Sequence, residues 1–420
     1  MTVSSLLPIL VPAVGTYLLF KLRFFFLLHP IRTLRDFLSS CKGRESRRSL
    51  FLALAGTLGV GNIFGVAAGL IYGGAGCVFW LAVSSIFAAV LKYSECTLCF
   101  AMRSECCGGM HLVLERCSSR FGKTFATLYA IAAVFLSFFM GGAMQVTAVA
   151  GAFVAISHGD AVLPAIIFAV LIFFGALGGG ERIEKITEYV IPLTMTVYIL
   201  LCFSSILQNV SSVSTVLSDI INDAKNMKSA AVGIGGFLVS RQFTEGFARG
   251  ILSNEAGCGT SSFAHTRAGE RTPYIAGLSG ICEVFFDTAV LCLLTAIAIL
   301  STGVNVSSYS SPMLLVSDTI GACFGDASRG LLLLSVAAFA YSTVICWFYY
   351  GSVCACYLLP KAGYKLFSPL FFLFLTVGSS VDSRLLIEVT DVLLLILSVL
   401  TLSAVIKSRE KIKSLTKNGS

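Results

Sequence analysis

Charge is scarce in this 420-residue chain. Only 12% of its residues are Asp, Glu, Lys or Arg, whereas an average soluble domain carries about 25%. The hydrophobic share is 56% and the mean hydropathy is +0.88, so too little polar surface remains to cover a water-soluble globule. These values exclude a soluble enzyme, a disordered chain and a nucleic-acid-binding domain, and they predict a polytopic membrane protein.

The sequence also lacks a disulfide or metal-binding pattern. Its 15 cysteines have no regular spacing, and most lie inside apolar runs, where a free thiol behaves as a small hydrophobic group. Cys106 and Cys107 form the one tight pair, and adjacent cysteines are poorly spaced for zinc. The four histidines are scattered, without a His-x-x-Glu-His motif or an equivalent. A membrane-embedded hydrolase or transferase is therefore a less favoured alternative.

Long apolar runs dominate the chain. A membrane helix needs about 20 mostly apolar residues, and this criterion predicts an all-α protein with about 11 transmembrane helices. They are expected at about 4–20, 48–72, 77–102, 124–156, 161–178, 186–207, 230–265, 274–301, 329–358, 365–380 and 384–406. The segment 230–265 carries Arg241, Glu245, Arg249 and Glu255, so we expect other helices to enclose it.

The basic residues predict the orientation. Most of the 30 Lys and Arg residues fall in loops that are cytoplasmic if the N-terminus lies outside, as the positive-inside rule requires. We therefore expect a multi-pass protein with its N-terminus outside and its C-terminus in the cytoplasm. The stretch 29–48 is expected to be an amphipathic interfacial helix with Ile31, Leu34, Phe37 and Leu38 toward lipid, or else a plain basic loop.

Two of the expected spans contain interruptions. The second span reads Ala55-Gly-Thr-Leu-Gly-Val-Gly-Asn-Ile-Phe-Gly65, with four glycines and Asn62 at a depth where lipid offers no water to a freed backbone. Close packing through Gly61 and Gly65 is the alternative, although packing needs no Asn. The seventh span has a similar run over 250–259. Interruptions at corresponding positions of two halves indicate a transporter site at the interface of an inverted repeat.

Counting from these breaks gives two sets of five helices with opposite orientation, preceded by one extra span. The expected units are an N-terminal span with an interfacial segment (1–47), the first repeat (48–207), an extracellular loop (208–229), the second repeat (230–406) and a basic cytoplasmic tail (407–420). The half-helix after a break offers free N–H groups to an anion, and the half-helix before it offers carbonyls to a cation.

Several motifs resemble the sodium:alanine (glycine) symporter family. They are Thr57-Leu-Gly-Val-Gly-Asn-Ile-x-Gly-Val-Ala67, Lys92-x-x-Glu-x-Thr-Leu98, Arg182-Ile-x-Lys-x-x-Glu188, Gly246-x-x-Arg-Gly-x-x-Ser-Asn-Glu-Ala-Gly257, Asp287-Thr288 and Ala340-x-Ser-Thr343. The resemblance covers roughly 15–405 and implies a LeuT-type fold with cotransport of alanine or glycine, in the L or D form, with sodium. It also implies that the protein lies in a bacterial-type cell membrane. Thr147 stands where the family usually has Asn, a departure that touches the substrate pocket.

Ser342 and Thr343 are candidate ligands of a cation. With the backbone carbonyls of Ala55 and Leu58, and that of Phe339 as a further candidate, they offer the oxygen atoms that a hard cation prefers. The resemblance to LeuT-type transporters implies that this cation is sodium. The alternative for both hydroxyls is a hydrogen bond to the carbonyl four residues earlier.

Other residues are candidates for holding a substrate. Thr57 and the backbone N–H groups from Gly59 to Gly61 suit a carboxylate. Asn62 either contacts substrate or cation, or caps the following half-helix. Gln145, an uncharged amide in an apolar stretch, suits a substrate ammonium or an interhelical hydrogen bond. Trp347 suits a pocket wall that limits side-chain size, or an anchor at the lipid interface.

The charged residues inside the expected spans divide into two groups. Lys92 and Glu95 are expected to form a structural ion pair on one helix face, and His265 is expected to be a hydrogen-bonded structural residue. Glu283 and Asp287 are candidates for a functional role, because an intramembrane carboxylate is a functional candidate by default. Glu283 could relay protons, and Asp287 is expected to pair with Arg249 or the Asn254 region, whereas no role is assigned to Glu255.

These observations predict a secondary transporter that imports a small neutral amino acid with sodium by alternating access. Its expected partners are the amino acid, the sodium ion and the lipid bilayer, and the protein is expected to be a monomer and not an enzyme. A proton-coupled symporter that uses Glu283 and Asp287 is the main alternative. A channel is disfavoured, since the sequence shows no filter motif.

Overall fold

The computed structural model describes residues 6–40, 43–104, 108–117, 120–157, 159, 162–225, 240–267, 272–378, 381 and 383–419. Within these ranges the regular structure is helical throughout. Among the described residues, six helices are long and apolar enough to cross a membrane, and the bent pair Arg44–Thr57 and Val60–Gly73 makes a seventh candidate. The expected all-α polytopic fold is confirmed, whereas the expected total of about 11 spans stays a prediction.

The described part of the first half of the chain contains twelve α-helices. They are α1 (Leu7–Lys21), α2 (Phe25–Leu28), α3 (Pro30–Ser40), α4 (Arg44–Thr57), α5 (Phe64–Gly73), α6 (Gly76–Ala101), α7 (Met110–Cys117), α8 (Gly122–Phe138), α9 (Met144–Ser157), α10 (Val162–Ala176), α11 (Gly179–Gln208) and α12 (Val210–Lys225). In α3, Ile31, Leu34 and Leu38 are exposed as expected, but Phe37 is only 5% exposed. Phe37 therefore packs against protein, and its expected contact with lipid is wrong.

The described part of the second half begins at Ser240 and contains nine α-helices. They are α14 (Arg241–Asn254), α15 (Ser262–His265), α16 (Pro273–Val284), α17 (Leu293–Ser301), α18 (Pro312–Phe324), α19 (Asp326–Leu358), α20 (Gly363–Gly378), α21 (Ser383–Lys407) and α22 (Arg409–Gly419). The expected start of the seventh span at residue 230 lies outside the described residues. Helix α16 begins where the Thr272 side chain accepts a hydrogen bond from the Ile275 N–H, with Pro273 in the first turn.

Both expected interruptions are present. Helices α4 and α5 are bent by 59°, and a single 3-10 turn, Val60–Asn62, lies between them. Helix α14 ends at Asn254 because Glu255 has a left-handed backbone with φ of 52°, and the chain becomes helical again only at α15. A left-handed residue that is neither Gly nor Asn is uncommon, so packing around the second break must hold it in place.

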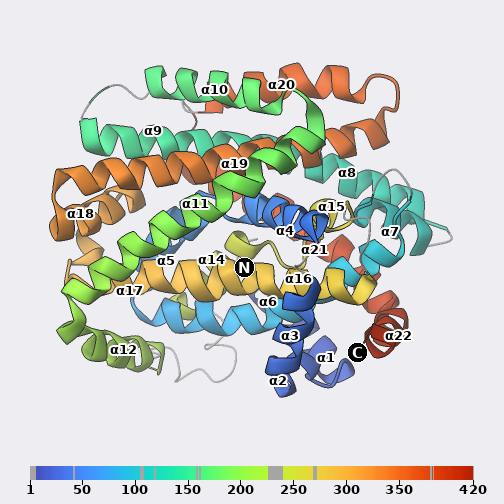
Figure 1. Ribbon diagram of the computed structural model, residues 1–420, viewed down its shortest axis with the longest axis horizontal. Coiled ribbons are helices and arrows are strands. Elements are labelled where there is room, and N and C mark those ends of the chain that lie inside the picture. Colours follow the sequence, from blue (N-terminus) through green and yellow to red (C-terminus); the bar gives the residue numbers. More distant parts are fainter. Residues whose placement is uncertain are drawn as a thin grey trace.

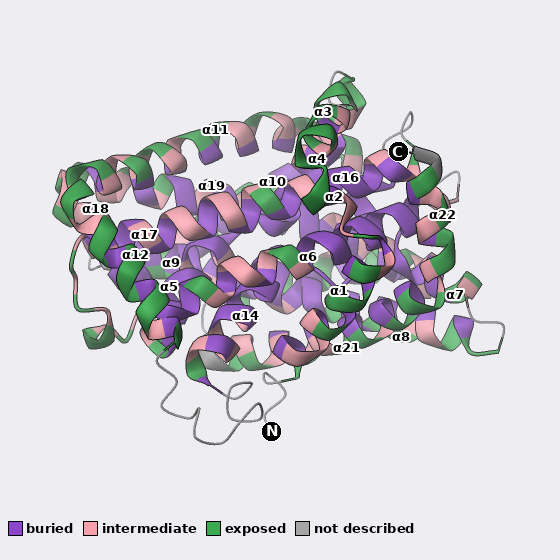
Figure 2. Ribbon diagram, turned by 90° about the horizontal axis from the view of Figure 1, so that it is seen from below, coloured by how far each residue is buried: buried purple, intermediate pink, exposed green. Residues whose placement is uncertain are grey.

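The long helices run side by side, and their ends form two opposite surfaces. Helices α12 and α18 lie at one end of the molecule, whereas α7 and α22 lie at the other, in both views (Figures 1 and 2). Large apolar side chains are exposed along α10 and α11, whereas buried residues fill the centre of the bundle (Figure 2). An exposed apolar outer face is expected of helices that contact lipid.

The second broken helix packs tightly against α6. A Cβ added at Gly246 would lie 2.7 Å from the Trp80 Cβ, and one at Gly250 would lie 3.2 Å from the Ser84 Cβ. Small residues let helix backbones approach closely, which drives association where lipid removes the hydrophobic effect. The glycines of α14 therefore place the second break deep in the bundle, next to α6.

Candidate functional site

Helix α19 covers the carbonyl groups at the end of α4. The Thr343 Oγ1 donates to the Ala55 carbonyl at 2.9 Å, and the Trp347 Nε1 donates to the Gly56 carbonyl at 3.2 Å. These two side chains are one helical turn apart, and both are buried. The interruption at the end of α4 is therefore in contact with the face of α19 that carries Thr343 and Trp347.

The Gln145 side chain reaches the same cluster from α9. It follows a π-helical turn, Phe139–Ala143, between α8 and α9, and such turns occur often at functional sites. Its Oε1 accepts from the Val60 N–H at 3.2 Å, and its Nε2 donates to the Met140 carbonyl at 3.1 Å. The amide of Gln145 therefore satisfies part of the broken backbone in this structure.

Gly59 makes this convergence possible. A Cβ added there would lie 3.0 Å from both the Gln145 Oε1 and the Thr343 Oγ1. The structure therefore brings together five of the expected residues or their backbones, from the first break, α9 and α19. They are Ala55, Gly59, Gln145, Thr343 and Trp347.

The other expected site residues do not join this cluster. The Ser342 hydroxyl donates to the Ala338 carbonyl at 2.9 Å, which is the alternative hydrogen bond considered for it. The Thr57 hydroxyl donates within its own helix to the Ala53 carbonyl at 3.3 Å. Leu58 caps α4 with its N–H on the Leu54 carbonyl at 2.6 Å, and Gly61 approaches the second break, near Ser253.

Asn62 points away from this cluster and toward Asp287. Its Nδ2 donates to the Asp287 Oδ1 at 2.7 Å, while Ser253 and Thr288 donate to the Asp287 Oδ2 at 2.7 Å and 2.8 Å. The Nδ2 of Asn254 in turn donates to the Thr288 hydroxyl at 3.1 Å. Asp287, which lies in a π-helical segment, Phe285–Cys292, therefore connects the two breaks.

This arrangement decides between the partners considered for Asp287. Its contacts are in the Asn254 region, whereas Arg249 pairs with Glu245 at 3.1 Å on the same helix. The Asn62 Oδ1 is buried and has no hydrogen-bond partner among the described atoms. Asn62 does not accept a hydrogen bond there from the backbone of the following half-helix, as a capping residue would.

A carboxylate from α6 occupies the freed backbone of the second break. The two Glu95 oxygens accept from the Gly257 N–H at 2.5 Å and from the Gly259 N–H at 3.1 Å. The Cys258 carbonyl accepts from the Tyr129 and Thr401 hydroxyls at 2.9 Å and 3.1 Å. The N–H groups expected to receive an anion at this break are thus satisfied by a carboxyl group of the protein itself.

The expected pair of Lys92 with Glu95 is wrong, because Lys92 has another counter-ion. Its Nζ lies 3.4 Å from the Glu283 Oε1 and 2.5 Å from the Ser261 Oγ. The other Glu283 oxygen lies 2.9 Å from the His265 Nε2, so the structural role expected for His265 is consistent with its position. Sequence spacing alone could not decide whether Glu95 or Glu283 is the counter-ion of Lys92, since either carboxylate could pair with a lysine on α6.

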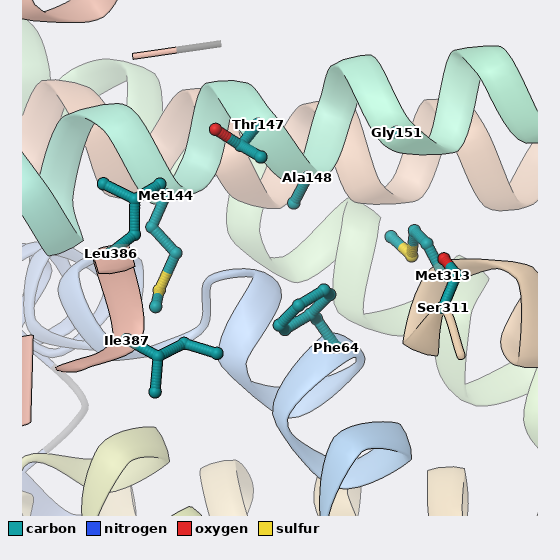
Figure 3. Close-up of a pocket in the computed structure, with 9 residues that line it drawn as sticks. All are labelled: Phe64, Met144, Thr147, Ala148, Gly151, Ser311, Met313, Leu386 and Ile387. Carbon is teal, nitrogen blue, oxygen red and sulfur yellow. The ribbon is translucent and has the colours of Figure 1, made fainter. Parts of the chain in front are cut away.

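An inner cavity of about 140 Å³ lies beside the first break. Figure 3 shows Met144, Thr147 and Ala148 on one wall, with Phe64 from α5 facing them. The Thr147 hydroxyl donates to the Gly378 carbonyl at 3.0 Å. The cavity therefore lies along the helix that carries Gln145, and the residue that departs from the family pattern lines it.

Two broken helices inside a bundle of apolar helices, with polar side chains gathered at the breaks, define a secondary transporter of the LeuT type. Solved structures with this fold include MhsT in complex with L-phenylalanine (TM-score 0.58, 13% identity, 90% of this chain and 98% of that one). Another is a Na⁺-coupled sialic acid symporter in a substrate-bound outward-open state (TM-score 0.56, 11% identity, 97% and 86%). At such identities the likeness shows the fold alone.

The chain belongs to the sodium:alanine symporter family, whose model matches residues 1–418. It is 30% identical to an uncharacterized transporter of Haemophilus influenzae, over 98% of this chain and 92% of that one. It is 29% identical to the sodium/alanine symporter AgcS of Methanococcus maripaludis, over 82% and 78%. The protein is therefore an amino-acid:cation symporter and not an enzyme.

Proposed function

We propose that this protein imports a small neutral amino acid, such as alanine or glycine, together with sodium by alternating access. The observation that carries the proposal is the meeting of Thr343, Gln145 and Gly59 at the first break. Oxygen atoms for a cation and an amide for an ammonium lie there side by side. The name of the relative AgcS, a sodium/alanine symporter, favours the same pair of cargoes.

The proposed sodium ligands are the carbonyls of Ala55 and Leu58 and the hydroxyls of Ser342 and Thr343. The Thr343 Oγ1 already lies 2.9 Å from the Ala55 carbonyl, so a small rotation would aim both oxygens at one ion. Ser342 would have to release the Ala338 carbonyl. Neutral oxygens replace the hydration shell of the ion only when several converge, which explains why both spans must contribute.

The proposed substrate site lies beside these ligands. The carboxylate would be held by Thr57 and the N–H groups of Gly59 to Gly61, with Asn62 at the far side of the break. The ammonium would donate to the Gln145 Oε1, in competition with the Val60 N–H that this oxygen now accepts. Substrate binding would thereby loosen one contact that holds the break together.

Trp347 is proposed as the wall that limits the size of the substrate side chain. Its indole N–H is fixed by the Gly56 carbonyl at 3.2 Å, and Gly141 leaves room for its ring, because a Cβ there would overlap it. A rigid wall is needed, since one extra methylene changes binding by only about 1–3 kcal/mol in a pocket that can adapt.

A sodium gradient supplies enough free energy for accumulation. A tenfold gradient contributes about 1.4 kcal/mol, and a potential of about 100 mV adds about 2.3 kcal/mol per charge. One sodium ion per zwitterion would then support an accumulation of several hundredfold, on the order of 10²–10³. This accumulation requires that the inward movements of sodium and of the amino acid be tightly coupled.

Proton coupling through Glu283 is the second candidate, and its surroundings argue against it. Lys92 and His265 both contact the carboxylate, and all three side chains are fully buried. Removing the charge of Glu283 would leave the Lys92 ammonium without its counter-ion, which is costly away from water. Asp287 is held by three donors and is better suited to linking the two breaks than to releasing a proton.

The orientation proposed is the one expected from the basic loops, in a cell membrane with the C-terminus inside. Helix α22 carries Arg409, Lys411, Lys413 and Lys417, and it lies with α7 at one end of the bundle, away from α12 and α18 (Figure 1). Basic residues gathered at one end favour the cytoplasmic assignment of that end. A monomer would suffice, because the proposed ligands come from one chain.

Uptake by proteoliposomes tests the proposal. The purified protein would be reconstituted, and the uptake of labelled alanine measured with an inward sodium gradient, with a proton gradient alone, and with choline in place of sodium. We expect concentrative uptake only with sodium. Uptake driven by protons in the absence of sodium would support the alternative, and no uptake of any neutral amino acid would refute both.

A further inference from the structure

A hollow of about 580 Å³ lies on the surface of the protein where α2 and α3 meet. Its walls include Leu28 at the end of α2 and Ile31, Arg32 and Arg35 in α3. None of the residues that line it belongs to either break or to the inner cavity. We call the stretch 28–38, with this hollow, the α2–α3 junction.

One face of α3 is apolar and exposed. Ile31, Leu34 and Leu38 are 83%, 54% and 57% exposed, and their spacing places them on one side of the helix. Arg35 is exposed as well, and it lies about one turn from both Ile31 and Leu38 on the same side. The guanidinium of Arg35 is therefore carried by the middle of an apolar stripe.

The opposite face of α3 is fixed to the protein. Phe37 is buried, and the Asp36 Oδ2 accepts a hydrogen bond at 3.2 Å from the Tyr274 hydroxyl in the first turn of α16. In α2, the ring of Phe25 packs against that of Tyr93 of α6, with the two centroids 4.8 Å apart. These contacts keep the apolar stripe turned away from the interior of the bundle.

The two arginines of the junction differ in their partners. Arg32 lies 3.9 Å from Asp36 at the next turn, whereas no ion pair of Arg35 is found among the described side chains. A guanidinium matches the geometry of a phosphate group, because it donates two parallel hydrogen bonds to it. Arg35 is therefore available to an anion from outside the protein.

The junction lies at the end of the molecule that carries α22. Helix α1 leads into it, and Lys21, the last residue of α1, pairs with Glu410 of α22 at 2.5 Å. This end is the one proposed to be cytoplasmic. The cytoplasmic leaflet contains anionic phospholipids, whose negative surface potential attracts basic residues next to the membrane.

We propose that the α2–α3 junction binds an anionic phospholipid from the cytoplasmic leaflet. The phosphate of the lipid binds Arg35, with Arg32 beside it, and the acyl chains lie along Ile31 and Leu38. A long arginine stem follows apolar surface while its charged end stays at the depth of the headgroups, so Arg35 contacts both parts of the lipid. The inference goes beyond the proposed function, because this lipid is not a cargo and its site shares no residue with the transport site.

Arg35→Gln is the appropriate test variant, because it removes the charge of an exposed residue and leaves the apolar stripe in place. The full-length protein, purified in detergent, would be titrated with phosphatidylglycerol or with phosphatidylcholine, and bound lipid would be counted by native mass spectrometry. The wild type should bind phosphatidylglycerol more tightly than phosphatidylcholine. We expect Arg35→Gln to weaken phosphatidylglycerol binding about fivefold and to leave phosphatidylcholine binding unchanged.

Arg409→Gln is the matched control. Arg409 is an arginine of α22 at the same end, its side chain is 42% exposed and lies 3.9 Å from Glu410, and it does not line the hollow. This variant loses the same charge as Arg35→Gln, so it should bind both lipids as the wild type does.

Thermal unfolding gives a second measurement. A ligand that binds the native state raises its stability, so phosphatidylglycerol should raise the unfolding midpoint more than phosphatidylcholine does. Arg35→Gln should remove this difference. Its midpoint in phosphatidylcholine should match that of the wild type, which would show that the variant is folded.

Three results would refute the inference. They are equal binding of the two lipids by the wild type, an unchanged lipid preference in Arg35→Gln, and displacement of phosphatidylglycerol by inorganic phosphate, which would indicate a site for a small anion. None of these measurements uses transport. A wild type that takes up no neutral amino acid would therefore refute the proposed function and leave this inference standing.

Discussion

Replacing Thr343 by Ala is the most direct test of the proposed sodium site. The hydroxyl lies 2.9 Å from the Ala55 carbonyl, and the Thr343 side chain is 1% exposed, so water cannot easily take its place. Losing a hydrogen-bond-like contact to a charged group costs about 1.5–3 kcal/mol, equivalent to about ten- to a hundredfold in affinity. We therefore expect the sodium concentration for half-maximal uptake to rise at least about tenfold.

The assay is alanine uptake by proteoliposomes over a range of sodium concentrations, with choline keeping the ionic strength constant. Thr343→Ser is the control, because it keeps the oxygen and removes only a methyl group, and it should behave nearly as the wild type. Linkage adds a second expectation: at a fixed low sodium concentration, Thr343→Ala should weaken alanine binding by the same factor.

The variant should still fold. In the wild type the hydroxyl donates one neutral hydrogen bond to the Ala55 carbonyl, and such a bond contributes about 0.5–1.5 kcal/mol. A silent Thr343→Ala substitution in folded protein would refute the proposed site. If Glu283→Gln abolished coupling at the same time, proton-driven transport would become the better explanation.

Three further predictions address the pocket, the buried ions and the topology. Gln145→Ala should strongly impair alanine binding, and Trp347→Phe should admit larger side chains, both measured by competition against labelled alanine. Glu283→Gln should lower the thermal unfolding midpoint, since a buried ammonium on Lys92 loses its counter-ion at a cost of about 3–5 kcal/mol. The sodium dependence of alanine uptake by the folded variant should nevertheless stay near normal. An impermeant thiol reagent applied to intact cells should not label Cys117, which lies in α7; Cys106, for which the same is expected, lies outside the described residues.

Each of these has a clear contrary result. Wild-type affinity and selectivity in both pocket variants would remove Gln145 and Trp347 from the site. An unchanged unfolding midpoint in Glu283→Gln would mean that the buried ion pair contributes little. Fast labelling of Cys117 from outside would reverse the proposed orientation.

The sequence by itself determined the class of the protein and the location of both breaks. Low charge and long apolar runs leave a membrane as the only suitable solvent. Glycines and Asn62 inside a span cannot continue a stable helix without other groups to satisfy the backbone. These are properties of single segments, so they can be recognised without knowing which segments touch. The bend between α4 and α5 is therefore where the sequence predicts it.

Only the tertiary structure decided which polar groups are partners. Lys92 and Glu95 are three residues apart, yet Lys92 binds Glu283 and Glu95 binds the backbone at Gly257 and Gly259. Helical periodicity shows which residues share a face, but it does not show which neighbouring helix that face meets. The two π-helical turns add to the difficulty, because each shifts the register of the residues that follow.

The junction of Asn62 with Asp287 has the same origin. These residues are 225 positions apart, and they meet because a bent α5 and a break in α14 bring both interruptions against one π-helical segment. A helix that continued unbroken through the first interruption would carry Asn62 elsewhere. The bends that the sequence reveals thus set where the side chains can go, and the packing of α6, α16 and α19 around them determines which groups they reach.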